Sequence, residues 1–247
     1  MNTSNNTILV TGGSAGIGLA MARQFLAQGN KVIILGRNAQ RLKGAEAALP
    51  GVTAIACDVN NASAVQQLTA RLNSDFPDLN ILVNNAGSAY VHNLAHGDQA
   101  YEKAAEEMNT NYLSIIRLTE LLLPLLKQQE EAAIVNVSSI VAFVPGVSIP
   151  TYAASKAALH SYSQALRFSL AQGTAVKVFE LMPPLVDTHF SKDIGGEKGI
   201  KPEQVASELF NAMQQDHYEV HVGGTADLYQ LFLKSPQEAL QALNSGF

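Results

Sequence analysis

Short apolar runs alternate with longer amphipathic stretches along the chain. The runs are rich in β-branched residues and apolar at consecutive positions, which is typical of strands buried on both faces. They occupy residues 7–10, 31–35, 52–57, 81–83, 133–137, 176–181 and 218–222. Apolar side chains at helical spacing lie between them, for example in residues 19–28, 62–72, 101–127 and 153–171. The alternation predicts a doubly wound α/β fold, with one parallel sheet of about seven strands and helices on both faces.

Composition narrows the class of protein further. The 247 residues are 47% apolar and 15% charged, with a net charge of −5, so one domain can bury a full core and nothing indicates a nucleic-acid partner. No apolar run reaches the roughly 20 residues that span a bilayer, and residues 1–6 lack the features of a signal peptide. The single cysteine, Cys57, cannot form an intramolecular disulfide, which fits a reducing compartment. We expect a soluble, cytoplasmic protein without a membrane span.

A glycine-rich turn follows the first apolar run. It reads Thr-Gly-Gly-Ser-Ala-Gly-Ile-Gly over residues 11–18. Glycines at this place let the backbone turn tightly and approach a pyrophosphate, whose charge is stabilised by a helix N-terminus. The spacing of Gly12, Gly16 and Gly18 differs from the general G-x-G-x-x-G pattern, and such a turn could be only a tight connection. Its position between a strand and a helix favours a Rossmann-type dinucleotide site.

The end of the second apolar run bears on which dinucleotide is bound. An NAD site normally has an acidic residue there for the ribose 2′-hydroxyl. This chain has Leu-Gly-Arg-Asn over residues 35–38, with no carboxylate. The guanidinium of Arg37 could hold the 2′-phosphate of NADP, which a carboxylate would repel. We therefore expect NADP rather than NAD, the alternative being that Arg37 is an ordinary solvated loop residue.

Tyr152 and Lys156 are four residues apart in a helical pattern, on the same face and about one turn from each other. An unperturbed tyrosine has a pKa of about 10, and a neighbouring ammonium favours the phenolate and lowers that pKa. The pair can therefore serve in acid/base catalysis. Surface helices also carry such pairs by chance, so the interpretation depends on what accompanies them.

With these motifs, the chain resembles the short-chain dehydrogenase/reductase family in its single-domain form, over nearly its whole length. Asn-Asn-Ala-Gly at 84–87 matches a family motif, Asp58 follows the third run, and Ser139 lies thirteen residues before Tyr152. The resemblance implies a catalytic set of Asn111, Ser139, Tyr152 and Lys156, and no metal. It also implies that the cofactor is bound by Gly12, Ser14, Gly16, Ile17, Gly18, Arg37, Asp58, Val59, Asn85, Ala86, Gly87, Tyr152, Lys156, Val186 and Thr188.

The resemblance further implies hydride transfer between a nicotinamide and a small carbonyl or alcohol, with Tyr152 as proton donor or acceptor. Residues 1–90 would mainly bind cofactor, and residues 91–247 would carry the catalytic residues and the substrate loop, in one domain. Paired helices between subunits would give a homodimer or homotetramer. Segments 30–38, 136–145 and 182–188 resemble the oxidoreductases associated with D-alanine esterification of teichoic acids. The rival hypothesis is a non-catalytic NADP-binding sensor or scaffold on the same fold.

Several positions leave alternatives open. Ser138 competes with Ser139 for the catalytic role, although the spacing to Tyr152 favours Ser139. Pro184 stands where the family usually has glycine, which removes a backbone donor beside the nicotinamide contacts expected from Val186 and Thr188. The glycine-rich segment 188–201 is interpreted as a substrate lid, the alternative being a mobile connection. Phe143, with the two residues after it, is expected to shape the pocket wall.

Overall fold

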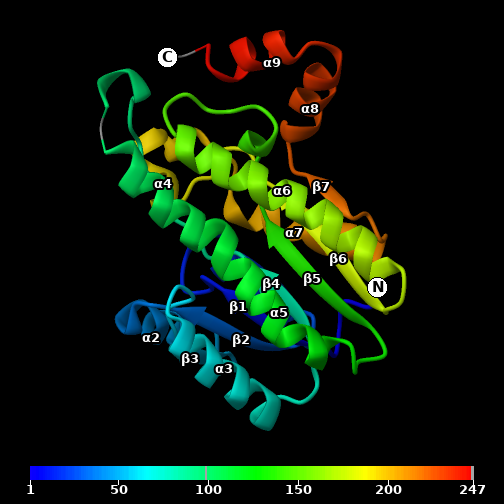
Figure 1. Cartoon of the computed structure of the whole chain (residues 1–247). Helices are drawn as coiled ribbons and strands as arrows, with labels where there is room; N and C mark the ends of the chain where they lie inside the picture. Colours follow the sequence, from blue (N-terminus) through cyan, green and yellow to red (C-terminus); the bar gives the residue numbers. More distant parts are fainter. Residues whose placement is uncertain (98, 246–247) are drawn as a thin grey trace.

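A parallel sheet of seven strands forms the centre of the molecule, for which the computed structural model describes residues 1–97 and 99–245 (Figure 1). The strands lie in the order β3-β2-β1-β4-β5-β6-β7, and every neighbouring pair is parallel. Their bounds are β1 Thr7–Thr11, β2 Lys31–Gly36, β3 Thr53–Ala56, β4 Leu79–Asn84, β5 Ala132–Val137, β6 Val176–Met182 and β7 Glu219–His221. The fold class expected from the hydrophobic pattern is confirmed.

Helices cover both faces because successive strand side chains point to opposite sides of the sheet. Ile8 and Val10 of β1 belong to a core with α1 (Gly16–Ala27), α2 (Ala39–Ala48) and α7 (Pro202–Gln214). Leu9 belongs to a second core with α3 (Ala62–Asp75), α5 (Ser114–Leu126) and α6 (Pro150–Ala171). Both β1 faces are therefore buried, which explains why the runs are apolar at consecutive positions. No helix in the described ranges is both long and apolar enough to cross a bilayer.

The helical stretch expected at 101–127 is not one α-helix. It consists of α4 (Ala100–Met108), a π-helical turn (Asn109–Leu113) and α5. The turn is polar at Asn109, Thr110 and Asn111, and the Asn111 amide bonds to groups outside the helix. π-Turns often occur at functional positions, because the extra residue redirects a side chain.

Two short helices, α8 (Thr225–Lys234) and α9 (Pro236–Leu243), follow β7 and lie together at one end of the molecule (Figure 1). Neither was among the stretches named from the pattern. Asn244, just after α9, accepts a hydrogen bond from the Val147 amide (2.9 Å) and donates one to the Pro145 carbonyl (3.0 Å). The end of the chain thus fixes the loop between β5 and α6.

The sheet order has a switch point between β1 and β4. From β1 the chain continues to β2 on one side, and from β4 it continues to β5 on the other. The connections leaving the carboxyl ends of these two strands diverge, and open α/β sheets bind ligands in the crevice that results. Gly12 follows β1 and Asn85 follows β4, so both predicted cofactor residues lie at this crevice.

Candidate active site

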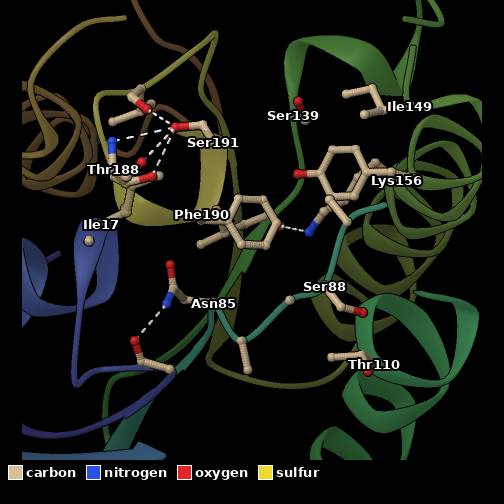
Figure 2. A pocket seen from close by; sticks show the side chains of 18 of the residues that line it. Ile17, Asn85, Ser88, Thr110, Ser139, Ile149, Lys156, Thr188, Phe190 and Ser191 are labelled. Atoms are coloured by element: carbon tan, nitrogen blue, oxygen red, sulfur yellow. Dashed lines mark hydrogen bonds between the residues drawn. The ribbon is translucent and has the colours of Figure 1, made fainter. Parts of the chain in front are cut away.

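A cavity of about 820 Å³ runs along the carboxyl ends of the strands. Its volume lies within the range of about 300–1,000 Å³ that is typical of small-molecule and cofactor sites. The lining includes the glycine-rich turn, the end of β2, the residues after β3 and β4, and Ser139, Tyr152 and Lys156. Figure 2 shows part of this wall, with Ile17 and Thr188 on one side and Ser139, Ile149 and Lys156 on the other. One cavity therefore joins the predicted cofactor and catalytic residues.

The glycine-rich turn requires glycine for conformation and for space. Gly12 has φ +66°, and a Cβ there would lie 2.9 Å from Asn85 Nδ2. A Cβ on Gly18 would lie 2.4 Å from the Gly12 carbonyl oxygen. Gly12, Ser14, Gly16 and Ile17 line the cavity, and α1 begins at Gly16, so its N-terminus faces this space. Gly18 is not among the lining residues and allows close packing of the turn instead.

Asn85 holds the ends of β1 and β4 together. Its side-chain Nδ2 donates to the Thr11 carbonyl (2.9 Å), and its backbone N–H donates to Thr11 Oγ1 (2.9 Å). Ala86, Gly87 and Ser88 continue from it along the cavity wall. The sequence predicted Asn85 as a cofactor contact, and the structure adds this fixed bond to the turn. The Ser88 hydroxyl oxygen is buried and makes no hydrogen bond with the described residues.

The β2 end of the cavity carries the positive charge. Arg37 lines it, as do Asp58 and Val59 from the loop after β3. Arg41, in the first turn of α2, also lines it and was not predicted. Asn60 Oδ1 is buried here without a partner among the described residues. Two exposed guanidiniums beside an unpaired polar atom fit the phosphate and polar groups of a dinucleotide.

Tyr152 and Lys156 lie on α6 as the spacing predicted, and both side chains are buried. Lys156 Nζ is 5.6 Å from the centre of the Tyr152 ring and donates a hydrogen bond to the Val137 carbonyl oxygen (2.7 Å). Burial raises the pKa of Tyr152, a hydrogen bond with Ser139 offsets part of that rise, and the Glu107 carboxylate adds to it. The pKa of Tyr152 is therefore raised and not lowered as expected, and the largest cause is removal of the phenol from water.

Lys156 has a perturbed pKa of its own. Burial lowers it to about 8, and the Glu180 carboxylate opposes that change. The side chain is therefore mostly protonated at pH 7. Glu180 is fully buried in β6 and bonds to His160 Nδ1 at 2.9 Å. The site thus combines a neutral phenol with a cation whose charge is favoured by a buried carboxylate.

The two candidate serines have different partners. Ser138 is 1% exposed and its Oγ donates to Glu180 Oε1 at 2.5 Å, so its hydroxyl proton is committed to the protein. Ser139 lowers the pKa of Tyr152, and its Oγ accepts a weak hydrogen bond from the Val141 amide (3.3 Å). Both serines line the cavity, but of the two only Ser139 acts on the pKa of Tyr152.

Asn111 lies in the π-helical turn, fully buried, and is not among the residues lining the cavity. Its Nδ2 donates to the Ser88 carbonyl oxygen (2.8 Å) and to Ser155 Oγ (2.9 Å), and its Oδ1 accepts from the Ser88 amide (2.9 Å). The side chain thus joins the loop after β4 to α6, three residues from Tyr152. The structure gives it a bridging position behind Tyr152 and Lys156, which are predicted to be catalytic.

The segment 188–201 is ordered into two 3-10 turns, His189–Ile194 and Gly196–Lys198. Its ends are tied together, since the Ile200 amide donates to the Leu185 carbonyl (3.0 Å) and the Asp187 amide to the Ile200 carbonyl (2.8 Å). Pro184 and Val186, just before the segment, and Thr188, its first residue, line the cavity. Phe190, half exposed, places its ring centre 6.0 Å from that of Tyr152 and stands over the cavity (Figure 2).

Other parts of the wall differ from the expectation. Leu243 and Asn244, at the end of α9, line the cavity, and no local sequence signal indicates this because it depends on where the chain end docks. Phe143 is not a lining residue. It packs in an aromatic cluster with Tyr229 (ring centres 5.0 Å apart) and Phe232 (6.0 Å), so the expectation for its segment is wrong. In residues 1–97 and 99–245, no three His, Cys, Asp or Glu side chains are grouped to hold a metal.

The family model for short chain dehydrogenases matches residues 6–199. Among similar proteins, the uncharacterized oxidoreductase DltE of Bacillus subtilis (strain 168) is 41% identical over 210 residues, covering 85% of this chain and 83% of that protein. Serine 3-dehydrogenase of Agrobacterium fabrum is 37% identical, covering 76% and 74%. The resemblance stated from the sequence is thus confirmed.

A solved structure agrees with the family match. A short chain dehydrogenase from Burkholderia cenocepacia J2315, in complex with NADP, superposes with a TM-score of 0.86 at 27% identity and covers 98% of both chains. The agreement in fold and the match over residues 6–199 point to the same family. The chain belongs to the short-chain dehydrogenase/reductase family of oxidoreductases, whose members use nicotinamide cofactors.

Proposed function

We propose that the protein is an NADP-dependent oxidoreductase that interconverts a carbonyl compound and the corresponding alcohol, with Tyr152 as proton donor or acceptor. The observation that carries the proposal is the single cavity that connects the glycine-rich turn with Tyr152, Lys156 and Ser139. When bound, the nicotinamide supplies or accepts the hydride. The protein then has to deliver a proton to the substrate oxygen, or remove one from it.

Tyr152 is suited to give the proton in the direction of reduction. Burial raises its pKa, so the phenol carries its proton at neutral pH. The ammonium of Lys156 then stabilises the phenolate that remains, because it lies near the ring in a site shielded from water. Ser139 donates a hydrogen bond to the substrate oxygen and positions it against Tyr152. Asn111 positions α6 through Ser155, and its own amide does not reach the substrate.

The choice of NADP rests on charge at the β2 end. Arg37 and Arg41 both line the cavity there, and no acidic residue ends β2. Two guanidiniums favour a 2′-phosphate, whereas a ribose 2′-hydroxyl gains little from them. The NADP complex of the Burkholderia relative supports this choice. NAD is the less favoured cofactor.

The proposal also covers the division of labour along the chain, the oligomeric state and the location in the cell. We propose one domain in which residues 1–90 mainly hold the cofactor and residues 91–247 supply the catalytic residues and a lid at 188–201. Exposed apolar side chains at Tyr101, Leu113 and Phe168 support a homodimer or homotetramer formed through α4 to α6. The buried Cys57, which forms no disulfide, supports a cytoplasmic location.

A panel of carbonyl compounds with NADPH tests the proposal against a sensor or scaffold. Consumption of NADPH is followed by its absorbance, and binding of NADPH is followed separately by fluorescence. Turnover of at least one carbonyl compound, faster with NADPH than with NADH, is the expected result. Tight NADPH binding without turnover of any aldehyde or ketone would favour the non-catalytic alternative.

A further inference from the structure

The Tyr152 end of the cavity is surrounded by apolar side chains from three separate parts of the chain. Val141 and Ile149 form a buried cluster with Tyr152, and Ile140, Ile194 and Leu243 pack against that cluster. All five of these apolar residues line the cavity. They come from the loop after β5, the segment after β6 and the end of α9. A group attached to the reacting carbon would therefore meet hydrocarbon on several sides.

Cationic side chains are distributed unevenly along the cavity. Among the described lining residues, Arg37, Arg41 and Lys156 are the Lys and Arg side chains. The two arginines lie at the β2 end, and Lys156 is buried with its Nζ bonded to the Val137 carbonyl. The lining side chain with a full charge on the 188–201 segment is the carboxylate of Asp193. Apart from the buried ammonium of Lys156, the Tyr152 end thus has the Asp193 carboxylate nearby and no Arg side chain among the described lining residues.

The polar side chains at this end are also unsuited to hold a carboxylate. Asn244 uses its amide on the carbonyls of Pro145 and Leu240, and its Oδ1 on the Val147 amide. His189 lies toward α1, since it also lines a second hollow with Gly16, Arg23 and Asp187. A carboxylate brought against the apolar wall would lose water without gaining a charged partner.

Resting on the proposed function, we infer that the substrate is an uncharged ketone, aldehyde or alcohol with an apolar group on the reacting carbon, and that free carboxylates are discriminated against. In this respect the chain differs from its relative named serine 3-dehydrogenase, because serine carries a carboxylate close to its hydroxyl. The reacting carbonyl meets Tyr152 and Ser139, and the apolar group contacts Ile149, Ile194 and Leu243.

A matched pair of substrates tests the inference. Ethyl acetoacetate and acetoacetate share the same ketone and differ in the charge next to it. With NADPH at neutral pH, kcat/KM for the ester should exceed that for the acid by about tenfold or more, because only the acid must be desolvated as an ion. An acid used as well as the ester would overturn the inference while leaving the proposed function standing. Turnover of neither compound, nor of any carbonyl in the panel, would overturn both.

Two substitutions on the 188–201 segment strengthen the test. Ile194→Arg places a cation at the apolar wall and should raise the ratio of acid to ester kcat/KM about tenfold, whereas Ile194→Gln, of similar length and neutral, should not. Asp193→Asn removes the opposing anion and should raise the ratio a few fold. Thermal melting and NADPH fluorescence confirm that each variant is folded and binds cofactor. An unchanged ratio in folded Ile194→Arg and Asp193→Asn would contradict the inference.

Discussion

Ser138 and Ser139 are adjacent, yet their different partners give Ser138 a role in stability and Ser139 a role in activity. Alanine substitutions can distinguish these two roles. Ser139 lowers the pKa of Tyr152, and its side chain is held only by a 3.3 Å hydrogen bond from the Val141 amide. Ser139→Ala should therefore remove a donor to the developing oxyanion and change stability little. Loss of one such donor costs about 10²–10³ in kcat, equivalent to about 2.7–4 kcal/mol of transition-state stabilisation.

Ser138→Ala should show the opposite pattern. The Ser138 hydroxyl donates to the buried Glu180 carboxylate at 2.5 Å, with the two residues 1% and 0% exposed. A hydrogen bond to a charged group contributes about 1.5–3 kcal/mol. In a chain of this size each kcal/mol shifts Tm by about 2–4 °C, so Ser138→Ala should lower Tm by roughly 3–12 °C. Its turnover below that Tm should stay within a few fold of the parent protein.

The assay combines thermal melting with kcat/KM on the best carbonyl compound from the panel, and each variant is the control for the other. NADPH fluorescence shows whether the cofactor site is intact. If Ser138→Ala lost turnover at an unchanged Tm while Ser139→Ala kept its activity, the assignment of the two serines would be reversed. Equal losses of activity in both variants would refute the separation of roles.

Two further predictions concern charge. Arg37→Ala should raise KM for NADPH about tenfold and leave KM for NADH almost unchanged. The control Lys43→Ala, at an exposed position on α2, should alter neither KM. Equal effects of Arg37→Ala on the two cofactors would contradict a 2′-phosphate contact. Hydrogen bonding to Glu180 raises the pKa of His160. The stabilisation that this interaction gives the fold is complete below the unfolded pKa of about 6.5 and is lost as pH rises through the higher folded pKa. In urea unfolding, His160→Gln should therefore lower the free energy of unfolding more at about pH 5.5 than at about pH 9. An equal loss at both pH values would refute this prediction.

The sheet could be predicted because each strand can be recognised from the pattern of its own residues. A strand covered on both faces is apolar at every position, as in the β1 residues Ile8, Leu9 and Val10, and such runs can be recognised without knowing their neighbours. The glycine-rich turn was recognisable for a similar reason, since Gly12 adopts a positive φ in a fixed place after a strand. The position of the crevice then followed from the order of elements.

Other features depend on contacts between distant segments, which spacing does not show. The π-helical turn at Asn111 was missed because the apolar residues before and after it keep helical spacing, and the bonds of Asn111 to Ser88 and Ser155 join segments that are distant in the sequence. The raised pKa of Tyr152 was missed because the sequence shows that Lys156 is one helical turn away but does not show that the Tyr152 side chain is buried. Leu243 reaches the cavity only through the docking of α9. The roles given to the candidate site residues remain predictions.

The most direct test of the account is Tyr152→Phe, which removes one hydroxyl from the buried ring. Turnover of every active carbonyl compound should fall by at least about 10²-fold, the lower bound typical of a lost general acid, while NADPH binding by fluorescence stays near that of the parent protein. Turnover that persists at the parent rate in the folded, NADPH-binding variant would contradict the central claim that Tyr152 transfers the proton.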